Sequence, residues 1–363
     1  MRNNFTLFIL LFISIFSYPV FFYNGEEITI FDIYISLIMF FMFFKFILTG
    51  RVRFFSNTKF LTCFFIFVCY MILRLAFQQC DTNATYPILF VVKYLEFLCI
   101  FIIAANLLSK TDRVPFLMID ITFLCLSVFQ LYSYFILDTW YRIGLPFKTG
   151  EVSPNPAGFV LTLFLLIYMY ELINGRLKVS QKVVALIGFV SLLLTFSRTN
   201  TILFAIISVL MLLASKKKKV TLLKKIKYFG IFAILSVLSN NILNMIIGNR
   251  IKYGMSFVAY IINPSNILAD GSLQLRMATF KYMFDCWTGS VSSIFFGNGI
   301  GFIEVADNLV FSLLVNMGLL GLVLFLFAWY FGILSSFPGI KLIKYVLLFT
   351  LLNGLTVETL LVS

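Results

Sequence analysis

The stretch GNRIKYGMSFVAYIINPSNILADGSLQLRMATFKYMFDCWTGSVSSIFFGNGIGFIEVADN (248–308) determines how the rest of the chain is interpreted. It lies between two hydrophobic segments that are each long enough to cross a bilayer. We therefore interpret residues 248–307 as one long loop outside the membrane, and we look there first for residues that carry chemistry. The loop contains a glycine triplet, Gly297-Asn298-Gly299-Ile300-Gly301, and the charged residues Arg250, Lys252, Asp270, Arg276, Lys281, Asp285, Glu304 and Asp307.

The composition is typical of a protein with many membrane spans. Hydrophobic residues make up 61% of the 363 residues, charged residues make up 12%, and the mean hydropathy is +1.02, whereas about a quarter of the residues in a soluble domain are charged. The chain contains no His, so imidazole is excluded as a general base or metal ligand. The six Cys include no CxxC pair, and a disulfide between Cys80 and Cys286 in the outer loops is left open.

Continuous apolar runs predict about eleven membrane-spanning helices. Strands are not expected, because no run alternates polar with apolar residues and backbone in lipid must satisfy its own hydrogen bonds. We interpret the first run, 1–22, as an uncleaved span, because no small-residue cleavage site follows it. The sequence thus predicts an all-α fold and a single integral membrane domain over residues 1–363. The other runs cover residues 28–48, 60–76, 88–108, 114–137, 156–173, 183–196, 201–215, 228–247, 308–334 and 341–360.

The distribution of basic residues predicts the orientation of the chain. With a cytoplasmic amino terminus, 19 of the 28 basic residues but only three of the 15 acidic residues fall on the inner side, in agreement with the positive-inside rule. The lysine cluster at 216–227 is then a topology signal, and no nucleic-acid partner is expected. Three substantial connections lie outside, at 78–87, 138–155 and 248–307.

Periodicity within the long loop predicts an amphipathic helix over 272–287 that rests on the membrane surface. Asp270 or Ser272 can cap its start, and Gly289 follows its end. A shorter helix over 252–262 would be ended by Asn263-Pro264. The apolar residues at helical spacing are Leu273, Met277, Phe280, Phe284 and Trp287.

Arg198 is the most informative single residue. It joins two runs of about fifteen residues that each reach only about 22 Å, short of a hydrocarbon core of about 30 Å. The turn around Arg198 must therefore lie below the outer membrane surface. A guanidinium at that depth is either a functional anion site or one half of a structural ion pair.

Other ionisable residues are expected near an outward-facing cavity. Arginine binds phosphate oxygens with a planar pair of donors, so Arg142, Arg198, Arg250 and Arg276 could converge on phosphate. Lys93 and Glu96 are more simply explained as a pair that neutralises itself on one helix. The acidic and basic residues in the outer halves of spans are Asp32, Arg74, Lys93, Glu96 and Glu358.

The glycine triplet is not a dinucleotide-binding fingerprint, because no strand precedes it. It predicts a tight turn that could offer N–H groups, including that of Gly299, to an anion. Glu304 or Asp307 could take a proton from an attacking hydroxyl group, or Asp307 and Asn308 could simply cap the next helix. Gly318 and Gly321 are interpreted as helix-packing positions.

The order of several motifs resembles the O-antigen polymerase and O-antigen ligase superfamily of bacterial membrane enzymes. The resemblance covers about residues 142–327, and the first five spans match only in general character. It depends on Pro154-Asn155 with Gly158, Leu194-Thr195-Phe196-Ser197-Arg198-Thr199, Arg276, Phe296-Gly297-Asn298-Gly299-Ile300-Gly301, Asp307-Asn308 and Gly318-Leu319-Leu320-Gly321.

The resemblance implies a C-type glycosyltransferase fold in the bacterial inner membrane, with an active face in the periplasm and neither metal nor cofactor. The implied substrate is an undecaprenyl-pyrophosphate-linked glycan, and the implied partners are the lipid bilayer, a chain-length regulator and a flippase. Among the matching positions, Arg198 and Arg276 would hold the pyrophosphate, with Asn155 and Asn308 beside it. Ligases of the superfamily have His where this chain has Asp307, which favours a polymerase. A ligase, and a flippase or transporter of lipid-linked sugar, are the alternatives.

Overall fold

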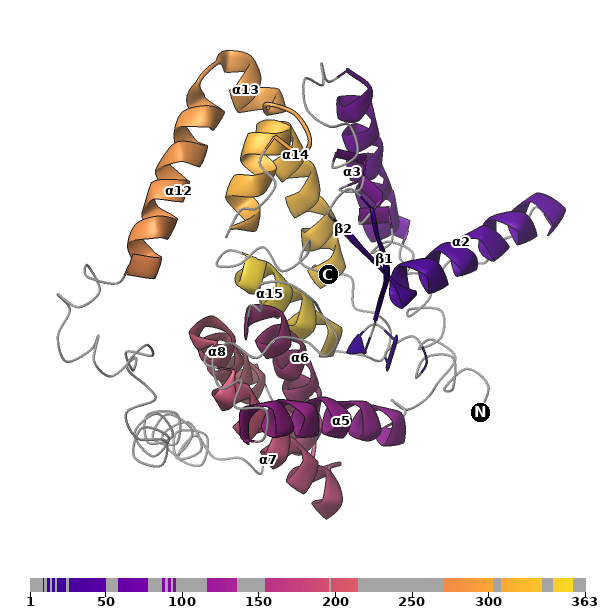
Figure 1. Cartoon of the computed structure of the whole chain (residues 1–363), viewed down its shortest axis with the longest axis vertical. Helices are drawn as coiled ribbons and strands as arrows, with labels where there is room; N and C mark the ends of the chain where they lie inside the picture. Colours follow the sequence, from indigo (N-terminus) through magenta and orange to yellow (C-terminus); the bar gives the residue numbers. More distant parts are fainter. Residues whose placement is uncertain are drawn as a thin grey trace.

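The computed structural model of the chain consists mainly of helices packed side by side (Figure 1). It describes residues 18–23, 26–49, 58–77, 116–135, 154–195, 197–214, 271–302, 308–334 and 342–354, together with a few residues before 17 and between 87 and 95. The predicted spans at 88–108 and 228–247 and the predicted helix at 252–262 lie wholly or largely outside these residues. Apart from α2 (Ile30–Thr49), the main described helices form two groups joined through α15 (Leu342–Gly354).

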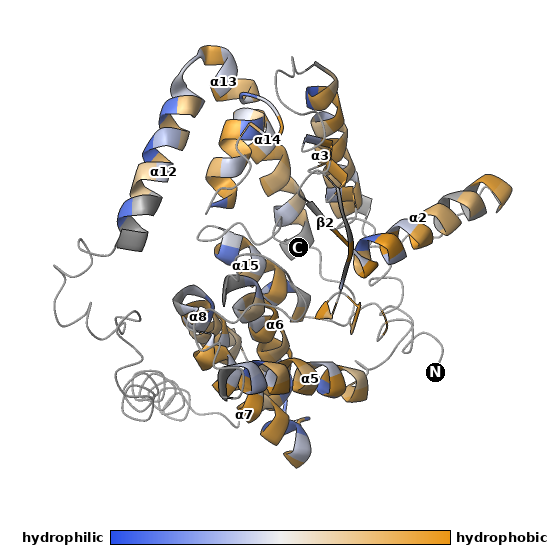
Figure 2. Cartoon of the chain, viewed as in Figure 1, coloured by the Kyte–Doolittle hydropathy of each residue, from blue (hydrophilic) through white to orange (hydrophobic). Residues whose placement is uncertain are grey.

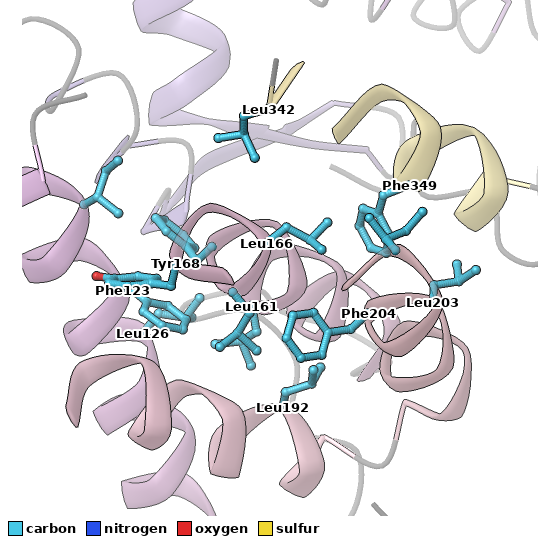
Figure 3. Close-up of a cluster of buried hydrophobic side chains, with 14 of the residues drawn as sticks. Phe123, Leu126, Leu161, Leu166, Tyr168, Leu192, Leu203, Phe204, Leu342 and Phe349 are labelled. Carbon is cyan, nitrogen blue, oxygen red and sulfur yellow. The ribbon is translucent and has the colours of Figure 1, made fainter. Parts of the chain in front are cut away.

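The first group is a bundle of α5 (Phe116–Phe135), α6 (Pro154–Ile173), α7 (Val179–Leu194), α8 (Arg198–Ala214) and α15. Its centre is a cluster of buried apolar side chains, seen in Figure 3, to which these helices contribute Phe123, Leu161, Leu192, Phe204 and Phe349. Lipid is as apolar as these side chains, so close packing and interhelical hydrogen bonds must hold the bundle together. Gly188 provides one close approach, because a Cβ there would lie 1.8 Å from the Phe123 ring.

Contacts along the bundle show that consecutive helices alternate in direction. Asp120 and Ser127 of α5 contact Gln181 and Ser191 of α7, respectively, so α5 and α7 run parallel. Between α5 and α6 the order is reversed: Asp120 meets Tyr168, whereas Phe123 stacks on Phe164. α8 packs on α6, and the two helices begin side by side where Gly158 lies against Ser197 and Asn200, so α8 runs with α6 and opposite to α7. This alternation is expected of successive passes through a membrane.

The second group contains α3 (Thr58–Phe77), α12 (Gly271–Thr288), α13 (Val291–Phe296) and α14 (Leu309–Leu334). α3 and α14 pack antiparallel, because Tyr70 lies against Gly321 and Phe67 lies against Phe325. Gly321 is therefore a helix-packing position, as predicted. Trp329 and Phe325 stack within the same buried cluster.

α14 is two helical arms that meet at Gly318, where the backbone leaves the helical region (φ 70°, ψ −172°). Trp329 of the second arm donates to the Leu347 carbonyl of α15, and Leu309 at the start of the first arm packs on Gly354 at the end of α15. In a straight helix Leu309 and Trp329 would be about 30 Å apart, whereas Leu347 and Gly354 are about 10 Å apart along α15. The first arm must therefore fold back at Gly318, and Figure 1 shows the two arms beside each other.

Four of the described helices are long and apolar enough to cross a membrane, and apolar residues cover much of their surface (Figure 2). α7 and α8 are shorter apolar helices. Exposed Phe and Leu side chains on α2 (Ile30–Thr49) and α3 would be unfavourable in water but suit lipid. The four candidate spans are Lys59–Ala76, Phe116–Ser133, Pro156–Ile173 and Leu309–Phe331, the last of which includes the bend at Gly318.

Most apolar runs that the structure describes became helices with bounds close to those predicted, from α2 to α15. The exclusion of strands was wrong. β1 (Pro19–Tyr23) and β2 (Glu26–Thr29) form an antiparallel hairpin, of which the first strand uses the end of the first apolar run. Short aromatic and β-branched segments such as Pro19–Tyr23 favour strands when a turn lets them pair locally.

The helix predicted over 272–287 is α12, and Gly289 follows it as expected. Its apolar residues do not share one face. Phe280 and Trp287 pack with Met283 against the first arm of α14, whereas Met277 and Phe284 are exposed. The set of apolar residues predicted to form the buried face of this helix omitted Met283, which is fully buried. α12 is therefore at least partly a packing helix that lies alongside α14 (Figure 1).

Candidate functional site

Polar side chains meet where α6 and α8 begin and α15 ends. The Asn353 Nδ2 donates to the Asn200 Oδ1 at 2.7 Å, and the Asn200 Nδ2 donates to the Ser197 Oγ at 2.8 Å. Gly158 lies directly against them, because a Cβ there would be 2.8 Å from the Asn200 Nδ2 and from the Ser197 Cβ. Ser197, Asn200 and Asn353 are all buried. We call Gly158, Ser197, Asn200 and Asn353 the polar junction.

The start of α14 adjoins the polar junction. Gly354, next to Asn353, would place a Cβ 2.8 Å from the Leu309 Cδ2. Asn308 caps this helix, because its Oδ1 accepts hydrogen bonds from the N–H groups of Val310 (2.9 Å) and Phe311 (3.2 Å). The structural alternative considered for Asn308, a helix cap, is thus confirmed.

Two predicted binding residues belong to the helix ends that meet here. Asn155 lies in the first turn of α6, one turn before Gly158, and Arg198 is the first residue of α8, next to Ser197. Both helices therefore direct their amino-terminal ends to the same place. The unpaired N–H groups and the helix dipole at such ends attract anions. The structure thus brings Asn155 and Arg198 into one neighbourhood.

The register of α12 places Arg276 at a similar level. The Phe280 and Phe311 rings stack with centroids 5.3 Å apart, and Met283 packs on Val315, so α12 and the first arm of α14 run parallel. One turn earlier on each helix, Arg276 is level with the residues that begin α14. The backbone of Arg276 therefore lies on the α12 turn nearest to Asn308.

The glycine triplet forms a turn that docks onto the bend of α14. The φ angles are +76° at Gly297, +125° at Gly299 and +79° at Gly301, so this backbone favours glycine. A Cβ on Gly297 would lie 2.4 Å from the Met317 N, and one on Gly318 would lie 2.4 Å from the Phe295 carbonyl oxygen. The predicted tight turn is correct. Gly318 lets this turn pack closely on α14, whereas it was predicted to let two spans pack together.

The first three N–H groups of this turn, those of Gly297, Asn298 and Gly299, are paired within the protein. Asn298 N–H donates to the Val315 carbonyl at 2.7 Å, and Gly299 N–H donates to the Asn316 carbonyl at 3.2 Å. The bend at Gly318 leaves these carbonyls without their usual helical partners, and the turn supplies the missing donors. The idea that the Gly299 N–H binds an anion therefore loses its geometric basis.

Arg74 and Tyr70 connect α3 to the same turn and bend. The Arg74 Nη2 donates to the Gly297 carbonyl at 3.1 Å, and the Tyr70 hydroxyl donates to the Met317 carbonyl at 2.9 Å. The Arg74 Nε is buried and has no hydrogen-bond partner. Of the ionisable residues assigned to outer halves of spans, Asp32 has a structural role, because it forms a capping box with Thr29 at the start of α2.

Several predicted site residues lie outside the described residues, namely Arg142, Arg250, Glu304 and Asp307. Sequence reasoning passed over Asn200 and assigned no role to Asn353. The sequence could have indicated both residues as partners in hydrogen bonds, because burying an amide side chain in an apolar helix costs free energy unless it is hydrogen-bonded. The identity of that partner is a contact between distant segments, which no local pattern encodes.

The fold and the site together define a helical membrane protein in which polar side chains and two helix amino termini converge on one end of a bundle. No model of a known protein family matches the chain, and no curated protein sequence matches it significantly. Among the described residues, no cluster of three or more His, Cys, Asp or Glu side chains could hold a metal ion.

Proposed function

We propose that the protein is an O-antigen polymerase, a membrane glycosyltransferase that joins undecaprenyl-pyrophosphate-linked oligosaccharide repeat units. One observation carries the proposal: the polar junction gathers the starts of α6, α8 and α14, which hold Asn155, Arg198 and Asn308. These residues lie far apart in the sequence, and their motifs are the ones that resemble the superfamily. The proposed setting is the bacterial inner membrane, with the junction facing the periplasm.

The reaction requires stabilisation of a departing diphosphate. The bond from the sugar C1 to the diphosphate oxygen breaks, the acceptor hydroxyl oxygen bonds to that C1, and undecaprenyl pyrophosphate leaves. Arg198 and Arg276 would neutralise the leaving group, and the amino-terminal ends of α6 and α8 would add donors. The hydroxyl proton would pass to Glu304 or Asp307, which lie four residues and one residue before Asn308 in the chain.

Substitution of the two arginines tests the proposal. Arg198→Ala and Arg276→Ala are each expected to reduce chain elongation about 100-fold or more, the usual cost of losing a group that stabilises developing negative charge. Arg176→Ala is the matched control, because Arg176 is exposed in the turn after α6, at the opposite end of the bundle. Polysaccharide ladders are compared on gels, with membrane insertion verified. Normal ladders from both variants would reject the proposal.

A purified system separates the polymerase from its alternatives. The wild-type protein in detergent, supplied only with carrier-linked repeat units, should produce longer glycans. A ligase would need a different acceptor, and a flippase would move the substrate without lengthening it. Absence of elongation under these conditions, with the protein folded, would count against a polymerase.

A further inference from the structure

The guanidinium of Arg74 is only partly satisfied by its surroundings. Arg74 lies near the end of a candidate span, Lys59–Ala76, and is half-buried. Its one hydrogen bond to a described residue is the bond to the Gly297 carbonyl, and its Nε is buried without a partner. A guanidinium has five N–H donors and a full charge, so among the described residues one neutral carbonyl satisfies only part of its hydrogen-bonding capacity and none of its charge.

No carboxylate among the described residues neutralises this charge. The neighbouring ionisable side chain on α3 is Tyr70, which directs its hydroxyl to the Met317 carbonyl. A cationic group within a membrane span is costly unless it pairs with an anion or faces a wet cavity, and such groups usually mark functional sites. We therefore expect the Arg74 guanidinium to pair with an anion that does not belong to α3.

We propose that Arg74 binds the diphosphate of one of the two lipid-linked substrates, beside the turn formed by residues 297–301 and at the other end of the first arm of α14 from Asn308. This inference rests on the proposed polymerase function and adds a binding residue from α3 to it. The Asn298 and Gly299 N–H groups of the turn are not available to the anion, because they donate to carbonyls of α14. The turn instead holds one arm of the Arg74 guanidinium through the Gly297 carbonyl, and the remaining N–H groups of the guanidinium can bind a phosphate oxygen pair.

A phosphate group could also reach Arg74 as the headgroup of an ordinary anionic phospholipid. The test therefore compares three probes on the full-length protein in detergent: undecaprenyl pyrophosphate, undecaprenyl monophosphate and phosphatidylglycerol. Binding is measured by native mass spectrometry. Arg74→Gln removes the charge and leaves an amide donor on a shorter side chain, so undecaprenyl pyrophosphate should bind about tenfold or more weakly.

Two control variants separate binding from structure. Lys59→Gln removes the same charge from the exposed, opposite end of α3 and should leave binding unchanged. Tyr70→Phe removes the neighbouring hydrogen bond to the bend without changing charge, and it should also leave binding within about twofold. Arg74→Lys, which keeps the charge but loses the planar fork, should fall between wild type and Arg74→Gln.

Unchanged carrier binding in Arg74→Gln would overturn the proposal; if that variant fails to insert, unchanged binding in Arg74→Lys would do so. An equal loss of carrier binding in Tyr70→Phe and Arg74→Gln would also overturn it. So would an Arg74→Gln variant that loses phosphatidylglycerol binding and undecaprenyl pyrophosphate binding equally. Chain elongation by the wild-type protein is measured in parallel. If the wild-type protein elongates chains and Arg74→Gln binds the carrier normally, the Arg74 site is rejected but the proposed polymerase function is not. Neither carrier binding nor elongation by wild type would reject both.

Discussion

Two polar clusters lie at opposite ends of the same bundle, and they are built differently. At one end, Asp120 of α5 accepts hydrogen bonds from the Tyr168 hydroxyl of α6 and the Gln181 amide of α7. At the other end, the polar junction is a chain of neutral groups, from Asn353 through Asn200 to Ser197. The first cluster consists of the Asp120 carboxylate and the two groups that donate to it. The second cluster lies next to the amino-terminal ends of α6 and α8 and to Arg198.

This difference separates a structural cluster from a candidate site. Asp120 accepts hydrogen bonds from both neighbouring helices and so ties three helices together. The polar junction contains no charge among its own four residues, yet it adjoins Arg198 and two helix ends that attract anions. We therefore interpret the Asp120 cluster as structural and the polar junction as the candidate site.

The largest expected effect comes from crowding the polar junction. In Gly158→Ala the new Cβ would lie 2.8 Å from the Asn200 Nδ2 and the Ser197 Cβ, so α6 and α8 must separate. A shift of about 1 Å in a catalytic arrangement can cost about 100-fold in rate, and overpacking costs about 1–3 kcal/mol of stability. Chain elongation and thermal unfolding of the purified variant measure the two effects. Gly289→Ala, where a Cβ meets nothing closer than 3.5 Å, should change neither.

A smaller effect, on stability alone, is expected at the opposite cluster. Tyr168→Phe removes a donor to Asp120 in a fully buried position. Loss of a hydrogen bond to a charged group should lower the free energy of unfolding by about 1.5–3 kcal/mol. Elongation per folded molecule should stay normal. A large loss of activity at normal stability would mean that this end also takes part in function.

The smallest effect is expected for the bond within the junction. Interhelical hydrogen bonds in membrane proteins contribute on average about 0.6 kcal/mol. The double-mutant cycle of Asn200→Leu and Asn353→Leu should therefore give a coupling energy of about 0.5–1.5 kcal/mol in unfolding experiments. A coupling near zero would show that Asn200 and Asn353 do not hold α8 and α15 together, and the junction would lose its structural basis.

The sequence predicted the helices better than it predicted their bends and contacts. The runs behind α3, α5 and α6 have the length and apolar composition that a span requires, so their bounds followed directly. The bend at Gly318 was missed because a glycine in an apolar run is equally typical of straight packed helices. The Arg74 bond to Gly297 joins residues 223 positions apart, and periodicity carries no information about such a pair.

Part of the candidate site followed from sequence for a physical reason. Arg198 was singled out because two short runs flank it, and the structure begins α8 at that residue. A helix cap was one of the two roles considered for Asn308, since Asn before an apolar run favours it. The use of the Gly299 N–H could not be foreseen, because it depends on carbonyls that only the bend of α14 sets free.

The length of the shorter helices has a consequence for the surrounding lipid. α7 has 16 residues and α8 has 17, so each reaches about 25 Å, and the second arm of α14 is of similar length. A bilayer with a hydrocarbon thickness of about 30 Å must thin next to them, or flanking residues must extend to the interface. The protein would then create a local depression in the membrane beside the polar junction, and shorter acyl chains should gather there.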